Sequence, residues 1–280
     1  MKVSSLHIYP VKSMQGVTVD EFAVTEKGPQ HDRLWMVTDE NYRFLTQRQI
    51  SKLATIKTHI ADDGALVLTL GNGRSHTIAV PGHGDISQAS VWKDDVAVFD
   101  AGEDAAEALS GYLGKTCRLV YQAPNAQRMT DPEYGQEGDH VSLADGFPIL
   151  ITNVASLTAL NLPEDITMDR FRANIVLDGL KPFEEDDIRV LKIGDVELEL
   201  VKPCARCVVT TQDQKSGERV TKEPIATLVK LRRGTKGAYF GQNAVPRQLG
   251  TIKAGDKVEI VSRRSAEHMQ LVPVQLKFAR

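Results

Sequence analysis

The chain has 280 residues, a net charge of -3 at pH 7, 41% hydrophobic residues and 25% charged residues. These values are typical of a soluble globular protein with one large or two modest domains. The small negative charge argues against a general nucleic-acid or membrane-surface binder. No apolar run approaches the ~18 residues of a membrane span, and residues 1–10 lack the apolar core of a signal peptide. The three cysteines form no disulfide framework and suit a reducing compartment, so we expect a cytoplasmic protein. Nothing in the sequence suggests an obligate assembly, and we expect a monomer.

Short alternating segments predict a mainly β protein. They recur along the first half and are separated by glycine-containing turns at 63–64, 71–73 and 81–84; three of them are residues 34–38, 65–70 and 96–99. Many short strands spaced by such turns are typical of barrel-like sheets. A helix is predicted at residues 103–113, where apolar residues recur at helical spacing.

The second half combines a polar connection, a further helix and more strands. Residues 122–140 are rich in polar residues and predict a linker or mobile loop, and a second helix is predicted from Asn153 to Leu160. From about residue 188 strands return, the last at 255–260. We therefore predict a mainly β (α+β) fold with two β-barrel-like domains and a few helices. The predicted divisions are residues 1–120, residues 121–265 and a C-terminal tail, 266–280.

The motif Pro203-Cys204-Ala205-Arg206-Cys207 carries the strongest chemical signal. It lies between an alternating run at 193–202 and a β-branched run at 208–211, which predicts a strand–turn–strand junction. A dithiol redox motif needs a helix N-terminus, and a structural zinc site needs four ligands, whereas the third cysteine, Cys117, is far upstream. What remains is a soft thiolate beside an arginine, which can hold a metal together with an anionic cofactor.

Cationic residues follow two early strands. Lys12 and Ser13 come after the first predicted strand, and Arg33 leads into another. Together they could bind a phosphate through charge-assisted hydrogen bonds. The alternative is that they are solvated charges at strand ends.

Three later segments are further candidates for ligand contacts. Gly146, followed by Phe147, lies in a tight turn, where neighbouring N–H groups could face a ligand or the glycine could be an ordinary loop residue. Arg172 and Asn174 share a face if their segment is extended, and they could clamp a phosphate or polar heterocycle, the alternative being a half-exposed edge strand. Residues 239–243 predict a glycine turn. No phosphate loop, nucleophile elbow or dinucleotide fingerprint is present, and the seven histidines show no metal-ligand spacing.

These segments in this order resemble the MOSC domain family. The resemblance includes the β-barrel domain that precedes MOSC and is strongest to the mitochondrial amidoxime-reducing component and bacterial YcbX-type proteins. It extends to about residue 262 and rests on six segments: residues 9–13, 32–33, 144–148, 171–174, 203–207 and 240–243.

The resemblance implies a molybdenum cofactor, Mo-molybdopterin, and a role for each matching residue. Cys207 corresponds to the cysteine that ligates molybdenum and to the catalytic centre. Lys12, Ser13 and Arg33 correspond to residues that hold the pterin phosphate. Further cofactor contacts are implied for Gly146 and Phe147 through backbone groups, and for Arg172, Asn174, Ala205 and Arg206.

The implied activity is reduction of N-hydroxylated compounds such as hydroxylaminopurines, amidoximes and hydroxylamines by removal of the oxygen atom. No cysteine follows Cys207, so we expect electrons from a separate donor protein of flavin reductase or ferredoxin type. No nucleic-acid polymer or membrane is expected as a partner. Two alternatives are a sulfur carrier with a persulfide on Cys207 and a non-catalytic binding or storage module for the cofactor. Opportunistic zinc binding by Cys204 and Cys207 is a third, weaker one.

Overall fold

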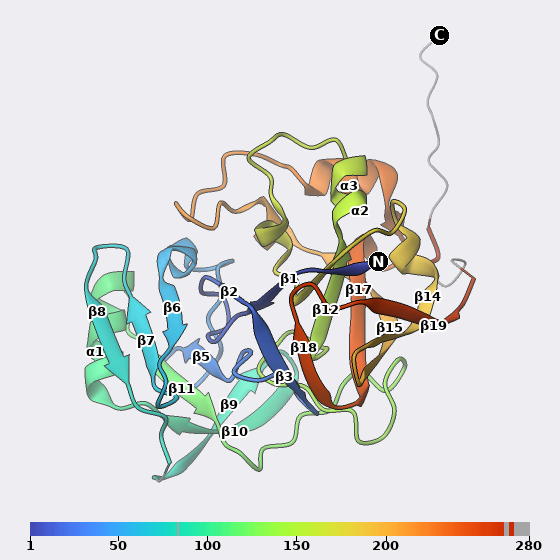
Figure 1. The fold of residues 1–280 in the computed structure, drawn as a ribbon. Coiled ribbons are helices and arrows are strands. Elements are labelled where there is room, and N and C mark those ends of the chain that lie inside the picture. The colour runs from blue at the N-terminus through green and yellow to red at the C-terminus, as the bar shows by residue number, and fades with distance from the viewer. Residues whose placement is uncertain (83, 266–268, 272–280) are drawn as a thin grey trace.

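The computed structural model describes residues 1–82, 84–265 and 269–271. Its largest sheet has nine strands among these residues, in the order β19-β14-β15-β17-β12-β13-β1-β2 with β16 beside β17 (Figure 1). They are β1 (Lys2–Ile8), β2 (Val17–Val19), β12 (Ile149–Asn153), β13 (Ile175–Asp178), β14 (Ile188–Ile193), β15 (Val196–Arg206), β16 (Arg233–Gly234), β17 (Gly237–Gln248) and β19 (Val258–Arg263).

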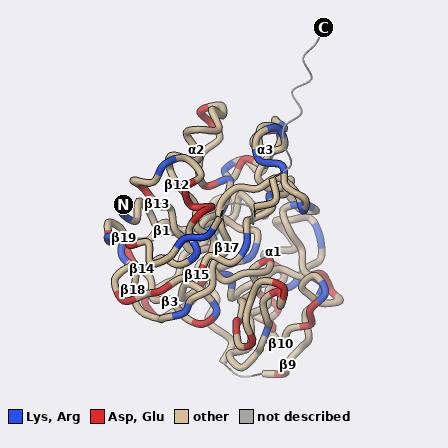
Figure 2. Tube along the Cα trace, turned by 90° about the vertical axis from the view of Figure 1, so that its right-hand side faces the viewer, with Lys and Arg blue, Asp and Glu red and all other residues tan. Residues whose placement is uncertain are grey.

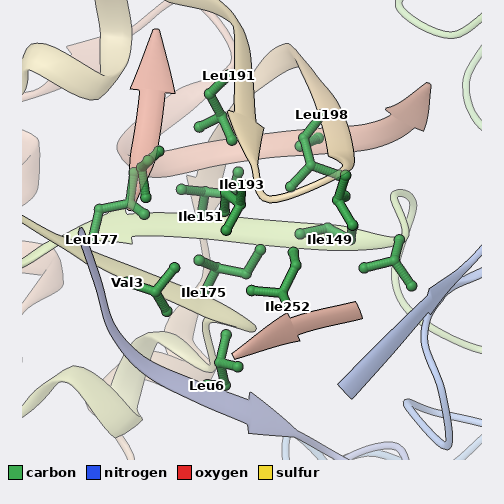
Figure 3. Close-up of a cluster of buried hydrophobic side chains, with 14 of the residues drawn as sticks. Val3, Leu6, Ile149, Ile151, Ile175, Leu177, Leu191, Ile193, Leu198 and Ile252 are labelled. Carbon is green, nitrogen blue, oxygen red and sulfur yellow. The ribbon is translucent and has the colours of Figure 1, made fainter. Parts of the chain in front are cut away.

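Hydrophobic alternation explains why these strands form one sheet. In β15 the first five residues alternate between buried and partly buried, as expected for strands with one face on a core. The inward side chains meet in a cluster that joins both ends of the chain (Figure 3); its members include Val3, Leu6, Ile149, Ile151, Ile175, Leu177, Leu191, Ile193, Leu198 and Ile252.

The N-terminal segment is part of this sheet. β1 pairs antiparallel with β13 in this sheet, whereas β3 (Glu21–Thr25) forms a separate three-stranded sheet with β4 (Gly28–Pro29) and β18 (Gly250–Lys253). Hydrogen bonding therefore joins the first 29 residues to strands that come after residue 121. The divisions at residues 120 and 265 stay a prediction.

A second group of strands lies at the left in Figure 1. One sheet has the order β5-β11-β10-β9 and another the order β6-β7-β8, with helix α1 (Glu103–Leu113) beside them. Their cores gather around buried side chains such as Trp35, Leu53 and Leu109. The strands are β5 (Trp35–Thr38), β6 (Lys57–Ile60), β7 (Leu66–Thr69), β8 (Ser75–Ile78), β9 (Ile86–Val91), β10 (Asp94–Asp100) and β11 (Arg118–Gln122).

Short helices complete the fold, and charged residues of both signs are spread over it (Figure 2). They are α2 (Val154–Ala159), α3 (Ile225–Leu231) and the 3-10 helices η1 (Ser51–Thr55), η2 (Met168–Phe171), η3 (Glu184–Asp187) and η4 (Val208–Thr211). No helix in the described part of the chain combines the length and apolar character needed to cross a membrane.

The mainly β fold and both predicted helices are confirmed. α1 has the predicted bounds, and α2 starts after Asn153, whose side chain accepts a hydrogen bond from the N–H of Ala155. Residues 123–148 contain no helix or strand, in agreement with a connecting loop. The predicted tail, 266–280, lies outside the described residues except for 269–271.

Three local predictions were wrong. Residues 208–211 form η4 and not a strand, because Thr210 and Thr211 donate their hydroxyl groups to carbonyls three residues earlier, at 2.9 and 2.7 Å. Residues 168–171, which come before β13, form η2 and not a strand. Residues 239–243 lie inside β17 and are not a turn.

Candidate functional site

One pocket collects most of the predicted site residues. It is lined by segments from both halves of the chain, and its charged side chains are six cations and one carboxylate, namely Lys12, Arg33, Arg48, Arg170, Arg172, Arg206 and Asp145. Nine of the ten predicted site residues line it. The exception is Ala205, which is exposed and pairs with Tyr239 at the end of β15.

The three residues predicted to hold a phosphate are packed into the protein. Lys12 is 4% exposed and its Nζ donates to the carbonyl of Leu143 at 2.9 Å and to Asp145 Oδ1 at 2.5 Å. Burial lowers the pKa of Lys12, and Asp145 acts against this. Arg33 Nη1 donates to Asp32 at 2.5 Å. For Lys12 and Arg33, the alternative of solvated strand-end charges is therefore wrong.

Backbone strain is concentrated around this pocket. Ser13, Arg33 and Arg172 have φ values of 67, 53 and 55°, in the left-handed region that side chains other than glycine rarely adopt. Such strain persists only where surrounding contacts impose it, and it is common at binding sites. Asn174, which is 1% exposed, helps to impose it: its amide donates to Asp32 and accepts from Arg33.

Arg172 and Arg170 depart from the extended segment predicted for them. Arg172 ends η2 in a left-handed conformation, and its guanidinium lies 4.2 Å from the Tyr9 ring centre. Removal from bulk water and the nearby charge of Arg33 lower the pKa of Arg172 to about 10. Arg170, for which half-exposure was the alternative, is 1% exposed and donates to Asp213 at 3.0 Å.

Several guanidinium N–H groups at this pocket are buried and have no partner among the described residues. They are Arg170 Nη1, Arg172 Nη2 and Arg206 Nε. A buried donor without an acceptor is costly, and more so in a charged group. An anionic ligand with several oxygen acceptors would satisfy these donors. The pocket therefore fits the phosphate and pterin of the cofactor that the sequence predicts.

Each cysteine thiol at the pocket lies beside an arginine. Arg48 Nη2 is 3.2 Å from Cys207 Sγ, and Arg206 Nη1 is 2.8 Å from Cys204 Sγ. Cysteine sulfur is a soft metal ligand, and a guanidinium N–H group beside it can donate a hydrogen bond to the sulfur. Cys207 follows the last residue of β15 and precedes η4, so strand and helix together hold its sulfur at the pocket.

Some lining residues were missed by the sequence reasoning. Arg48 lies in the polar run 46–49, which has no chemical signature of its own. Asp145 belongs to a segment that resembles the family, but no role was predicted for it, whereas Asn243 lies in the segment 239–243, for which a ligand contact was one interpretation beside a structural turn. A run of polar residues between two buried segments was the available signal for Arg48.

Comparisons with known proteins identify the family of this chain. The MOSC N-terminal beta barrel domain matches residues 1–116, and the MOSC domain matches residues 138–259. Mitochondrial amidoxime-reducing component 1 of Mus musculus is 32% identical over 283 residues, which cover 93% of this chain and 82% of that protein. This chain belongs to the MOSC family.

Other MOSC family members match over similar stretches. Mitochondrial amidoxime-reducing component 1 of Homo sapiens is 32% identical over 93% of this chain and 83% of its own length. Molybdenum cofactor sulfurase of Danio rerio is 34% identical over 86% of this chain. The match covers 32% of the sulfurase, so this chain corresponds to about a third of that larger protein.

Proposed function

We propose that this protein is a molybdenum-cofactor-dependent oxidoreductase that reduces N-hydroxylated compounds. The observation that carries the proposal is a set of buried guanidinium N–H groups, without partners in the described part of the chain, around a pocket that is also lined by Cys207. Membership of a family that contains amidoxime-reducing components supports the same reaction. Hydroxylaminopurines, amidoximes and hydroxylamines are the proposed substrates, and the proposed location is the cytoplasm.

The bound cofactor supplies two-electron chemistry that breaks the N–O bond, while a separate flavin reductase or ferredoxin-type donor supplies the electrons. In total, the N–OH group takes up two electrons and two protons and gives N–H and water. Cys207 would bind the metal through its thiolate, and Arg48 would stabilise the negative charge on that sulfur. Lys12, Arg33 and Arg172 would bind the anionic part of the cofactor.

The remaining contacts keep these binding residues in place. Asn174 forms hydrogen bonds with both Asp32 and Arg33. The ring centre of Tyr9 lies 4.5 Å from the Arg33 guanidinium and 4.2 Å from the Arg172 guanidinium. Asp145 binds Lys12 at the edge of the pocket. We propose that these neighbours orient the cations before the cofactor binds, so that little side-chain entropy is lost on binding.

A sulfur carrier is the second candidate. The likeness to molybdenum cofactor sulfurases favours it, and so does the position of the Cys207 sulfur beside the Arg48 guanidinium, which would stabilise an anionic persulfide. Here Cys207 would carry one extra sulfur atom and no molybdenum would be needed. Intact-protein mass spectrometry separates this candidate from the oxidoreductase.

The deciding experiment compares metal and pterin content in wild type, Cys207→Ala and Cys204→Ser, expressed in a host that makes the cofactor. We expect about one molybdenum and one pterin per wild-type chain. Cys207→Ala should lose the thiolate signature of the metal and all turnover of an N-hydroxylated base, while Cys204→Ser, the matched thiol control, should keep measurable turnover. Full activity in Cys207→Ala protein that carries the cofactor would contradict the proposal.

A further inference from the structure

Trp92 is a large aromatic residue in an unfavourable backbone conformation. It begins the two-residue connection between β9 and β10 and has a φ of 59°. Glycine and asparagine are favoured at such turn positions, because the left-handed region is sterically costly for bulky side chains. The backbone of this turn therefore does not favour tryptophan, and the contacts of the indole side chain must explain its presence.

The indole is held by three neighbours and remains half-exposed. It packs against the Phe44 ring at 5.0 Å, the Arg48 guanidinium lies 4.8 Å from its centre, and Nε1 donates to Asp145 Oδ1 at 3.3 Å. Despite these contacts Trp92 remains 50% exposed. A rigid indole that is held by three neighbours and keeps half of its surface free is suited to stacking with a ligand.

This indole lies next to the proposed reaction centre. Arg48, which touches the indole, also lies 3.2 Å from Cys207 Sγ. Trp92 lines a groove together with Asp145, Gly146 and Phe147, and the same three residues line the cofactor pocket. The groove and the pocket are therefore adjacent, and a molecule bound beside Trp92 lies next to the pocket.

We propose that Trp92 is a specificity-determining residue, on which a planar aromatic N-hydroxylated substrate stacks. This inference rests on the proposed function and adds the substrate class: aromatic bases and arylamidoximes are preferred over aliphatic N-hydroxylated amines. An aromatic ring can stack on the free part of the indole, whereas an alkyl group lacks a π face and gains less from the same contact.

Three variants test the role of the ring. Trp92→Gly removes the indole and accepts the positive φ, so the relief of backbone strain offsets part of the lost contacts with Phe44 and Arg48 and the protein should still fold. Trp92→Phe keeps an aromatic ring. Ile86→Ala is the control, because Ile86 is 59% exposed at the far end of the same hairpin and lines neither the pocket nor the groove.

The cofactor-loaded protein is assayed with benzamidoxime and with N-hydroxylated acetamidine as its aliphatic counterpart. For Trp92→Gly we expect KM for benzamidoxime to rise about tenfold, equivalent to ~1.4 kcal/mol, with a smaller change for the aliphatic compound. Trp92→Phe should keep most of the preference, and Ile86→Ala all of it. Equal changes for both substrates in Trp92→Gly would overturn the inference.

Calorimetric binding without an electron donor separates this inference from the proposed function. Benzamidoxime should bind the loaded wild type about tenfold more tightly than Trp92→Gly. If that difference is found but no reductant supports turnover, the proposed function fails and the inference about Trp92 stands. If turnover is found and the two proteins bind benzamidoxime equally well, the inference fails and the proposed function stands.

Discussion

The arginines of the pocket show how single residues can favour binding over stability. Arg172 is removed from bulk water, lies near the like charge of Arg33, and its Nη2 has no hydrogen-bond partner within residues 1–82, 84–265 and 269–271. Each of these features raises the free energy of the cofactor-free protein. Each would be relieved by a bound anion, so the same side chain stabilises the loaded state.

Replacing Arg172 by Gln should therefore weaken cofactor binding more than it weakens the fold. A charge-assisted hydrogen bond contributes ~1.5–3 kcal/mol, so we expect the cofactor affinity to fall about 10- to 100-fold. The glutamine side chain is two atoms shorter, so the hydrogen bond from Arg172 Nη1 to Met14 O at 2.7 Å is lost as well. The measurements are pterin retention during dialysis and the melting temperature of the cofactor-free protein.

Arg74→Gln is the control for this change, because Arg74 is exposed in the turn between β7 and β8. Arg74→Gln should change neither pterin retention during dialysis nor the melting temperature of the cofactor-free protein. If Arg172→Gln retains the cofactor as well as wild type does, Arg172 is not a cofactor-binding residue.

At the scale of residues, a local sequence pattern singles out only those residues that belong to a recognisable motif. Lys12, Arg33, Arg172 and Cys207 were singled out because they belong to motifs, and the structure brings them into one pocket. Arg48 and Trp92 belong to no motif. Their significance comes from contacts with Cys207 and with each other, which join positions far apart in the chain.

At the scale of elements, the sequence predicted helices whose hydrogen bonds and apolar spacing lie within one segment. α1 has a regular apolar spacing and ends at Gly114, which adopts the left-handed conformation favoured at a helix C-terminus. η4 was missed because β-branched residues such as Val208 and Val209 favour strands. Two threonine hydroxyls override that preference locally, and strand propensity takes no account of them.

The 3-10 helix η3 carries a buried acid. Glu185 is 1% exposed; its Oε2 accepts from Ser156 at 2.7 Å and from Asn153 at 3.1 Å, and its Oε1 has no partner among the described residues. Burial, together with the charge of Asp186, raises the pKa of Glu185 to about 7. The hydrogen bonds from Ser156 and Asn153 link η3 to the start of α2; they favour the ionised carboxylate and offset part of the effect of burial on the pKa of Glu185.

This pKa predicts that the free energy of unfolding falls as pH rises from about 4.5 to 7. In that window the folded state keeps the proton of Glu185 and the unfolded state has lost it, so deprotonation favours unfolding. The loss attributable to Glu185 is about 3 kcal/mol. Glu185→Gln should remove this part of the pH dependence and stabilise the protein at pH 8, as measured by urea unfolding at pH 5 and pH 8.

Glu107→Gln is the matched control, since Glu107 is exposed on α1. It should leave the pH dependence of wild type intact. Parallel pH profiles for wild type and Glu185→Gln would show that Glu185 titrates near its ordinary value in the folded protein.

At the scale of the whole molecule, the two halves of the chain share one sheet and one pocket. β1 supplies Val3 and Leu6 to the core of the large sheet, whose remaining strands, apart from β2, come after residue 148. The sequence predicted two β-rich halves in order along the chain. It could not predict the pairing of β1 with β13, because the two strands are far apart in sequence and alternation does not specify a partner.

If the two halves are coupled in this way, they should unfold together. Leu6 is fully buried in the large sheet, and Leu6→Ala should cost ~2–5 kcal/mol. Trp35 is 1% exposed in the core of the other half, so in a Trp92→Phe background its fluorescence reports on that half alone. In urea, Leu6→Ala should lower the midpoint seen by Trp35 as much as the midpoint seen by circular dichroism, whereas Val261→Ala, at a 56% exposed position of β19, should move neither. A Trp35 midpoint that stays at its original value in Leu6→Ala would mean that the halves unfold independently.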